Sequence, residues 1–293
     1  MKRVLIAGSA LAVIAPLIVS VPVVHASETC SRIDTTAKGE IGGKDVTNFR
    51  GKDLRGANLR GDDLVDDDFR KADLRKAKLQ KARLDGADLR KANLKKADLQ
   101  DANLRGADLR GAKLDGANFR DAYLLEANLK GVDLTRAKLG VFEPKGPVGL
   151  DLSKANLSGA NLEGQSLTLV DAERANFSNA DLEAVALVGA DLSCGNFTNA
   201  NMKRAYLLEA VLSEARMAGA NLVEVRAPNA NFDDADLQGA DFSGAVLTGA
   251  DFSGANLTGA NFAGADVTGA NFFGATGVNL DGAIGAETVF GLS

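Results

Sequence analysis

Several residue types on which enzymes depend are scarce in this chain. Its 293 residues include no Trp, two Tyr, two Cys, five Pro and one His. That histidine, His25, ends an apolar N-terminal segment, and its removal with that segment would take away the commonest general base and metal ligand. The sequence also has no glycine-rich phosphate loop, nucleophile motif or spaced metal-ligand cluster. We therefore expect no catalytic residues, no cofactor and no metal.

The N-terminal segment has the three parts of a secretory signal peptide. Lys2 and Arg3 are basic, residues 4–24 are apolar apart from two serines, and 24–26 offer small or medium residues around a cut after Ala26. The alternative is an uncleaved membrane anchor, because the apolar run is nearly long enough to span a bilayer. Two prolines interrupt the run and favour cleavage. We predict a signal peptide at 1–26, no stable membrane span after cleavage, and an extracytoplasmic location: the periplasm, the thylakoid lumen of a cyanobacterium, or secretion.

What the chain has in place of these residues is a strict period of five. From Phe49 to Leu139 every fifth residue is Leu or Phe, which gives 19 consecutive centres, and 14 of the 19 have Ala two positions earlier. A second array, with 25 centres from Leu152 to Phe272, follows in a shifted phase. A period of five fits neither a helix nor a flat strand. It fits a coil that turns a corner every five residues and directs one large and one small side chain inward.

The repeated strings identify a family. Ala57-Asn58-Leu59-Arg60-Gly61, Ala107-Asp108-Leu109-Arg110-Gly111 and Ala250-Asp251-Phe252-Ser253-Gly254 resemble the defining unit of pentapeptide-repeat proteins. The resemblance implies an all-β fold, a right-handed quadrilateral β-helix with four units per coil. The 44 units then give about eleven coils, stacked at roughly 4.8 Å.

This reading divides the chain into six parts. They are the signal peptide at 1–26, an N-terminal cap or arm at 27–48, a basic first array at 49–139, a Pro/Gly loop with a register shift at 140–151, an acidic second array at 152–275, and a C-terminal cap at 276–293. Lys52, Asp62 and Asp67 occupy slots that the family fills with Ala. Because an inward charge is costly unless paired or hydrated, we expect the first coils to be loose there.

With four units per coil, residues 20 apart stack on one face. The first array then carries a candidate basic docking stripe, formed by Arg50, Arg70, Arg90, Arg110, Lys130, Arg55, Arg75 and Lys95. The alternative is a salt-bridged solvated surface, because Asp68, Asp88 and Asp108 point out of the same face. Residues 152–272 hold 6 basic and 15 acidic residues, a balance of −9. The two arrays therefore differ in charge, which raises head-to-tail association as a hypothesis; the sequence leaves the oligomeric state open.

A second candidate surface is apolar. Leu169, Val188, Tyr206 and Leu208 lie at or beside outward slots of one predicted face, joined by Ala186. Scattered outward apolar residues are common, but a cluster is typical of a partner-binding patch. Cys30 and Cys194 could pair in an oxidising compartment, although only an arm running along the coils could join them.

These features favour a non-enzymatic extracytoplasmic scaffold or protein-interaction rod. Its expected partner is a protein or an anionic envelope component, and no nucleic acid is expected. The family resemblance implies one alternative, a DNA-mimic protein that binds and protects DNA gyrase. That alternative requires a cytoplasmic protein, whereas the first array is basic and the N-terminus has the form of a signal peptide.

Overall fold

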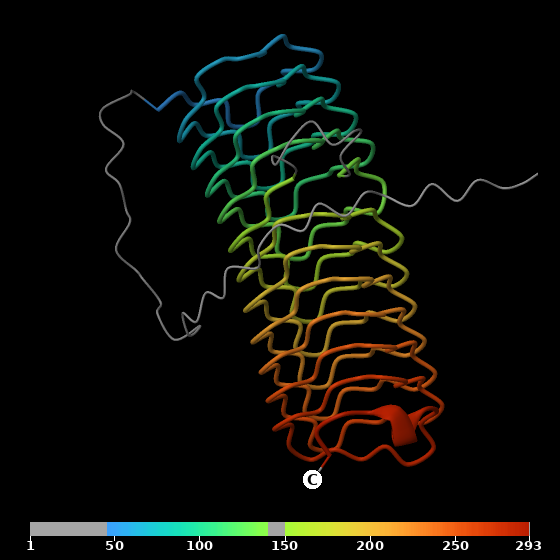
Figure 1. Cartoon of the computed structure of the whole chain (residues 1–293). Helices are drawn as coiled ribbons and strands as arrows, with labels where there is room; N and C mark the ends of the chain where they lie inside the picture. The colour runs from blue at the N-terminus through green and yellow to red at the C-terminus, as the bar shows by residue number, and fades with distance from the viewer. Residues whose placement is uncertain (1–45, 140–149, 293) are drawn as a thin grey trace, which may run out of the picture. The chain divides into compact units, whose positions relative to one another are not determined.

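The computed structural model describes residues 46–139 and 150–292, and the predicted signal peptide lies outside them. The described chain winds into a stack of coils (Figure 1). Its contacts between coils are isolated parallel bridges, such as Asn48↔Asp68 and Asp68↔Asp88. The bridges in each array join residues 20 apart, which confirms the predicted spacing of four five-residue units per coil. The one helix in the described residues is the 3-10 helix η1, Ala286–Thr288.

Each unit makes one side of the coil and one corner. Leu54 donates its backbone N–H to the carbonyl of Asp73 in the next coil at 2.8 Å, and Asp73 donates back to Lys52 at 2.9 Å. At the corner, the N–H of Ala72 closes a turn onto the carbonyl of Phe69 at 2.9 Å. Because the third residue of such a turn needs a positive φ, glycine is frequent there, as at Gly56 with φ 66°.

The core is one continuous column of inward Leu, Phe and Ala side chains. From Leu64 onward these side chains are almost all fully buried, whereas Phe49, Leu54 and Leu59 at the first coil are only partly buried. Phenylalanines 20 apart stack face to face in the second array, with ring centroids 4.9 Å apart for Phe232 and Phe252. The predicted thin core of small and aliphatic residues is what the structure contains.

The three charged residues in Ala slots behave differently from one another. Lys52 and Asp62 are exposed, which removes the cost of burying their charges. Asp67 is buried, with 1% exposure, and its Oδ1 accepts the backbone N–H of Thr47 at 2.8 Å. Its Oδ2 has no hydrogen-bond partner among the described residues. Asp67 therefore holds the first described residues against the stack.

The columns of stacked residues continue from the first array into the second, although the five-residue repeat changes register in the sequence between them. The bridges Tyr123↔Asp151, Asn128↔Asn156 and Asp133↔Asn161 join residues 28 apart, which is one coil plus eight residues. Each column of the first array therefore continues into a defined column of the second. The sequence alone left this phase open.

At the C-terminal end the period breaks but the stacking continues. Ile284 pairs with Asp266 and Phe290 pairs with Asn271 across shorter offsets of 18 and 19 residues. Ala275, Val278, Leu280, Ala283, Ala286 and Val289 pack against the last regular coil. Residues 276–292 thus form an irregular final coil over the end of the hydrophobic core.

Candidate binding surfaces

The outward Asp or Asn of each unit has a structural task that the sequence did not reveal. Its side-chain Oδ1 accepts the backbone N–H two residues later, as Asp68 does from Arg70 at 3.0 Å and Asn176 from Ser178 at 3.1 Å. This local bond satisfies a backbone donor at the corner, where Asp and Asn are favoured for that reason. Most of the outward Asp and Asn residues are therefore turn caps rather than a reserve of free carboxylates.

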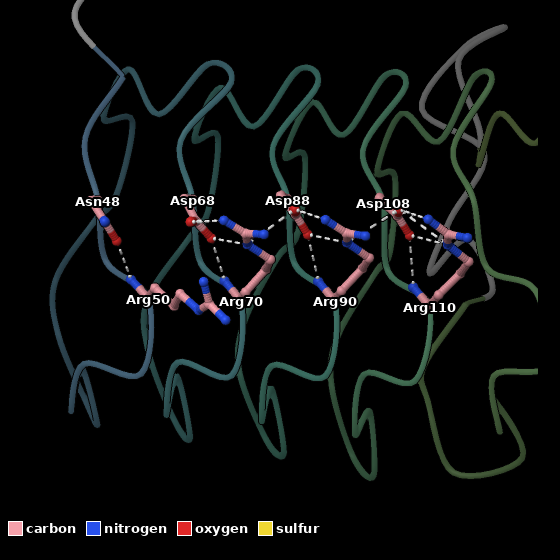
Figure 2. A network of polar contacts seen from close by, with 8 residues as sticks. All are labelled: Asn48, Arg50, Asp68, Arg70, Asp88, Arg90, Asp108 and Arg110. Carbon is pink, nitrogen blue, oxygen red and sulfur yellow. Dashed lines mark hydrogen bonds and ion pairs between the residues drawn. The ribbon is translucent and has the colours of Figure 1, made fainter.

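Four arginines of the predicted basic stripe lie in one row, namely Arg50, Arg70, Arg90 and Arg110 (Figure 2). All but Arg50 bond to the neighbouring row of Asp68, Asp88 and Asp108. The Arg90 guanidinium makes two hydrogen bonds to Asp88, at 2.8 and 2.5 Å, and its Nε lies 3.6 Å from Asp108 of the next coil. Arg70 repeats this arrangement with Asp68 and Asp88. The result is a ladder of alternating charge that runs from coil to coil.

This ladder lowers the pKa values of its carboxyl groups. Hydrogen bonds from the Arg70 guanidinium lower the pKa of Asp68 from 3.8 to about 2, and those from Arg90 lower the pKa of Asp88. The row of arginines begins at Arg50, and the residue two positions before Arg50 is Asn48 instead of Asp. Within the described residues the Arg50 guanidinium makes no ion pair.

The rest of the predicted stripe lies on the adjacent face and is also mostly paired. Arg55 bonds Asp53 at 2.8 and 2.5 Å, Arg75 bonds Asp73 in the same way, and Lys95 lies 2.5 Å from Asp115. Lys130 and Arg110 continue the first column, and Arg110 is bound to Asp108. The structure thus brings the eight predicted residues onto two neighbouring faces and supports the salt-bridged interpretation for six of them.

Four lysines at the corners also have no ionic partner within the described residues. Lys71, Lys76, Lys91 and Lys96 are exposed and make no ion pair or side-chain hydrogen bond within the described chain. They flank the face that carries Arg55, Arg75 and Lys95. One hollow, at the corner column that contains Lys71 and Lys91, is lined entirely by basic residues, namely Arg50, Arg70, Lys71, Arg90 and Lys91.

The predicted apolar residues do come together, on a different face of the second array. Ala186 pairs with Tyr206 in the next coil, and the N–H of Leu169 bonds the carbonyl of Val188 at 2.9 Å. Leu169 is 62% exposed, Tyr206 43% and Leu208 39%. We call these five residues the apolar patch. It spans three successive coils of an otherwise polar wall.

Three further features bear on chemistry. Cys194 lies at a corner and is disulfide-bonded, and the other cysteine of the sequence, Cys30, lies outside the described residues. No group of three or more His, Cys, Asp or Glu in the described ranges could hold a metal ion. In the described chain, no helix is both long and apolar enough to cross a membrane.

Comparisons with known proteins agree on the repeat. The family model described as "Pentapeptide repeats" matches in eight copies, over 68–106, 102–140, 155–193, 190–226, 211–249, 235–276 and 250–284. No curated protein sequence matches the chain.

Solved structures of repeat proteins are also similar to the chain. HetL, involved in heterocyst differentiation regulation in the cyanobacterium Nostoc sp. strain PCC 7120, is 29% identical, with 83% of this chain and 93% of HetL covered and a TM-score of 0.29. QnrB1, a plasmid-mediated fluoroquinolone resistance protein, is 17% identical over 69% and 88%, with a TM-score of 0.37. A pentapeptide repeat protein of the Arabidopsis thaliana thylakoid lumen is 28% identical over 40% and 68%, with a TM-score of 0.21.

These superpositions are loose, so the assignment rests on the repeats themselves. The matched ranges cover more than half of the sequence, and the structure has the twenty-residue coil that the repeat requires. The chain belongs to the pentapeptide-repeat family.

Proposed function

We propose that this protein is a non-enzymatic binding protein that acts outside the cytoplasm and holds a protein partner against the wall of its solenoid. The observation that carries the proposal is the apolar patch. Few large apolar side chains are exposed in the arrays, yet Leu169 is exposed on one coil and Tyr206 and Leu208 on the coil two further along, with Ala186 and Val188 between them. A contiguous apolar surface rimmed by polar residues is typical of protein-binding sites.

The composition of the patch favours a protein partner. Tyr206 presents an apolar ring with a polar hydroxyl, and Arg226 lies over that ring at 5.7 Å. Tyrosine and arginine are enriched at the centres of protein interfaces, where each combines contact area with hydrogen bonding. Because the coils are fixed to one another by backbone hydrogen bonds, the patch is preorganised and loses little conformational freedom on binding.

Two observations support a location outside the cytoplasm. The N-terminal sequence has the three parts of a signal peptide. Cys194 is disulfide-bonded, and disulfides persist mainly in oxidising compartments.

The basic stripe is a weaker candidate for the protein-binding surface, because most of its cations are already paired with aspartates.

The chain contains a matched control for the patch. Residues 205–210 are identical in sequence to residues 122–127, but Tyr123 and Leu125 lie on another face, where Tyr123 pairs with Asn103 and Asp151. We expect Tyr206→Ser with Leu208→Ser to abolish capture of the native partner in cross-linking of host extracts. Tyr123→Ser with Leu125→Ser should leave capture intact.

Location has its own test. Fractionation of the native host with mass spectrometry of the mature N-terminus should find a chain that begins at Ser27, outside the cytoplasm. An intact Met1 in the cytoplasmic fraction would contradict the proposal and make gyrase binding the next experiment.

For the patch variants, equal loss of capture in both double variants would show that the apolar patch has no special role.

A further inference from the structure

We infer that the lysine-edged face of the first array binds a linear acidic polysaccharide along the solenoid axis. This face consists of Asp53, Arg55, Asp73, Arg75, Asn93, Lys95, Lys113 and Asp115, and its two edges are the corner columns that contain Lys71 and Lys91 on one side and Lys76 and Lys96 on the other. The inference goes beyond the proposed function, because it names a ligand for a surface that the apolar patch does not use.

Charge on this face is unevenly distributed between its centre and its edges. At the centre, each of the two arginines is bonded to its own aspartate, and Lys95 is bonded to Asp115. At the edges, the four corner lysines are exposed and have no ionic partner within the described residues. The edges therefore supply net positive charge, while the centre supplies fixed hydrogen-bonding groups.

The backbone at these lysines is unusual for their residue type. Lys71, Lys76, Lys91 and Lys96 have φ between 58 and 60°, a conformation that costs a residue with a Cβ on the order of 1 kcal/mol. The corners directly before and after them in the two columns are all glycine: Gly51, Gly56, Gly111 and Gly116. Glycine adopts this conformation without steric cost. The four lysines therefore occupy sites that glycine would fill without this cost, as do other non-glycine corners such as Lys81 and Lys154. What distinguishes the four is that they flank one face in adjacent coils.

The lysines form a regular two-by-two array. Lys71 donates its backbone N–H to Arg90 in the next coil, and Lys76 donates to Lys95, each at 3.0 Å. Successive lysines in a column are thus about one strand spacing apart, roughly 4.8 Å. The Cγ atoms of Lys91 and Lys96 approach the corners of Gly111 and Gly116, so their stems lie along the solenoid axis. Two parallel rows of cations suit an extended ligand that lies between them.

The residues between the rows favour a polysaccharide over other polyanions. The carboxylates of Asp53 and Asp73 and the amide of Asn93 can accept hydrogen bonds from sugar hydroxyls, whereas polyphosphate offers no such donors. The face has no aromatic side chain on which a base could stack, because Tyr123 and Tyr206 lie on other faces. It has no apolar side chain that could enter a bilayer. An acidic polysaccharide supplies both the anionic groups and the hydroxyls.

The test measures binding of a short polygalacturonate oligosaccharide to the purified full chain by calorimetry at low and high salt. The variant carries Lys71→Gly, Lys76→Gly, Lys91→Gly and Lys96→Gly, and glycine keeps the corner geometry. We expect binding to weaken on the order of tenfold or more and the salt dependence to flatten, since four cations are lost. The melting temperature should stay the same or rise.

The control is Lys81→Gly with Lys154→Gly, two corner lysines with φ 60 and 57° that lie off this face, and its effect is compared with the loss per lysine in the fourfold variant. It should bind like the unmodified chain. Equal binding by the fourfold variant would overturn the inference, as would tighter binding of polyphosphate or of anionic phospholipid vesicles. The outcome is independent of the proposed function: a chain found in the cytoplasm could still bind the oligosaccharide, and an extracytoplasmic chain that captures its protein partner could fail to.

Discussion

The two arrays build the same coil but hold neighbouring coils together with different side chains. The first array links them through arginine–aspartate ion pairs around a core that is mainly leucine. The second links them through asparagine side chains, as in Asn221→Asn201 and Asn201→Asp181, each at 3.0 Å, and through stacked phenylalanines. The family fold therefore fixes the inward residues and the corners, while the wall is free to be charged or neutral. Family membership implies that the shared coil is a right-handed quadrilateral β-helix.

The largest effect should come from the aromatic column. Phe252 stacks on Phe232 and Phe272 at 4.9 and 5.1 Å and meets Phe242 and Phe262 edge to face. Phe252→Ala should lower the free energy of unfolding by about 3–5 kcal/mol, measured by chemical denaturation. The comparison is Leu94→Ala, in the leucine core of the first array. A smaller loss for Phe252→Ala than for Leu94→Ala would show that the stacks add nothing to the second array.

The side-chain links between coils should contribute differently to stability at high salt in the two arrays. Asp88→Ala removes the cap of Arg90 and the ion pairs to Arg70 and Arg90. Asn201→Ala removes amide hydrogen bonds to Asn221 and Asp181, neither of which is an ion pair. Each should cost about 1–2 kcal/mol. The cost of Asp88→Ala should shrink at 1 M salt, where charges are screened beyond about 3 Å, and the cost of Asn201→Ala should not. Salt-independent costs at both sites would contradict an ionic link in the first array.

The corners should behave alike in both arrays. Gly106 and Gly239 both have φ 66°, and an added Cβ would meet no atom within 4 Å at either site. Replacement by Ala should therefore cost about 1 kcal/mol at each, from backbone strain alone. Thermal melts of the two single variants provide the comparison. Clearly unequal costs would mean that the arrays differ in backbone as well as in wall chemistry.

The smallest effect should be a dependence of stability on acid in the first array. The pKa of Asp68 falls from 3.8 to about 2 in the folded state, because Arg70 bonds its ionised form. A lowered pKa contributes stability that is fully present above about pH 4 and is lost as the pH falls towards 2. Solvent exposure keeps this contribution small. Unfolding midpoints across that range should fall less in an Arg70→Gln, Arg90→Gln variant; identical profiles would argue against the ladder.

Much of the fold followed from the sequence because the repeat is strict. The period of five predicted which residues lie inside, and residues 20 apart do stack. The apolar patch was predictable as a cluster for the same reason, although its role in binding stays a prediction. Asp67 was harder to place, because a charged residue in an Ala slot can turn outward, as Asp62 does, or be buried and bonded to a backbone donor.

The state of the charges did not follow from the sequence. Stacking places Arg90 near Asp88 and near the aspartates of the adjacent coils. Whether the Arg90 guanidinium turns to these aspartates or to solvent depends on side-chain geometry. In the structure the Arg90 guanidinium turns to Asp88 and Asp108. The corner lysines, Lys71 and Lys91 among them, are exposed and make no ion pair within the described chain. The phase between the arrays was likewise open, because a shift of three and an insertion of eight give the same sequence pattern.

The offset of 28 residues at Tyr123↔Asp151 makes the junction between the arrays a natural site for extension. Because the columns of stacked residues continue beyond the junction, the number of residues at the junction does not affect the pattern of outward side chains in either array. A change in the number of residues at this junction can therefore leave every ladder, stack and patch with its present neighbours. Evolution can alter the chain at this one point without redesigning either array.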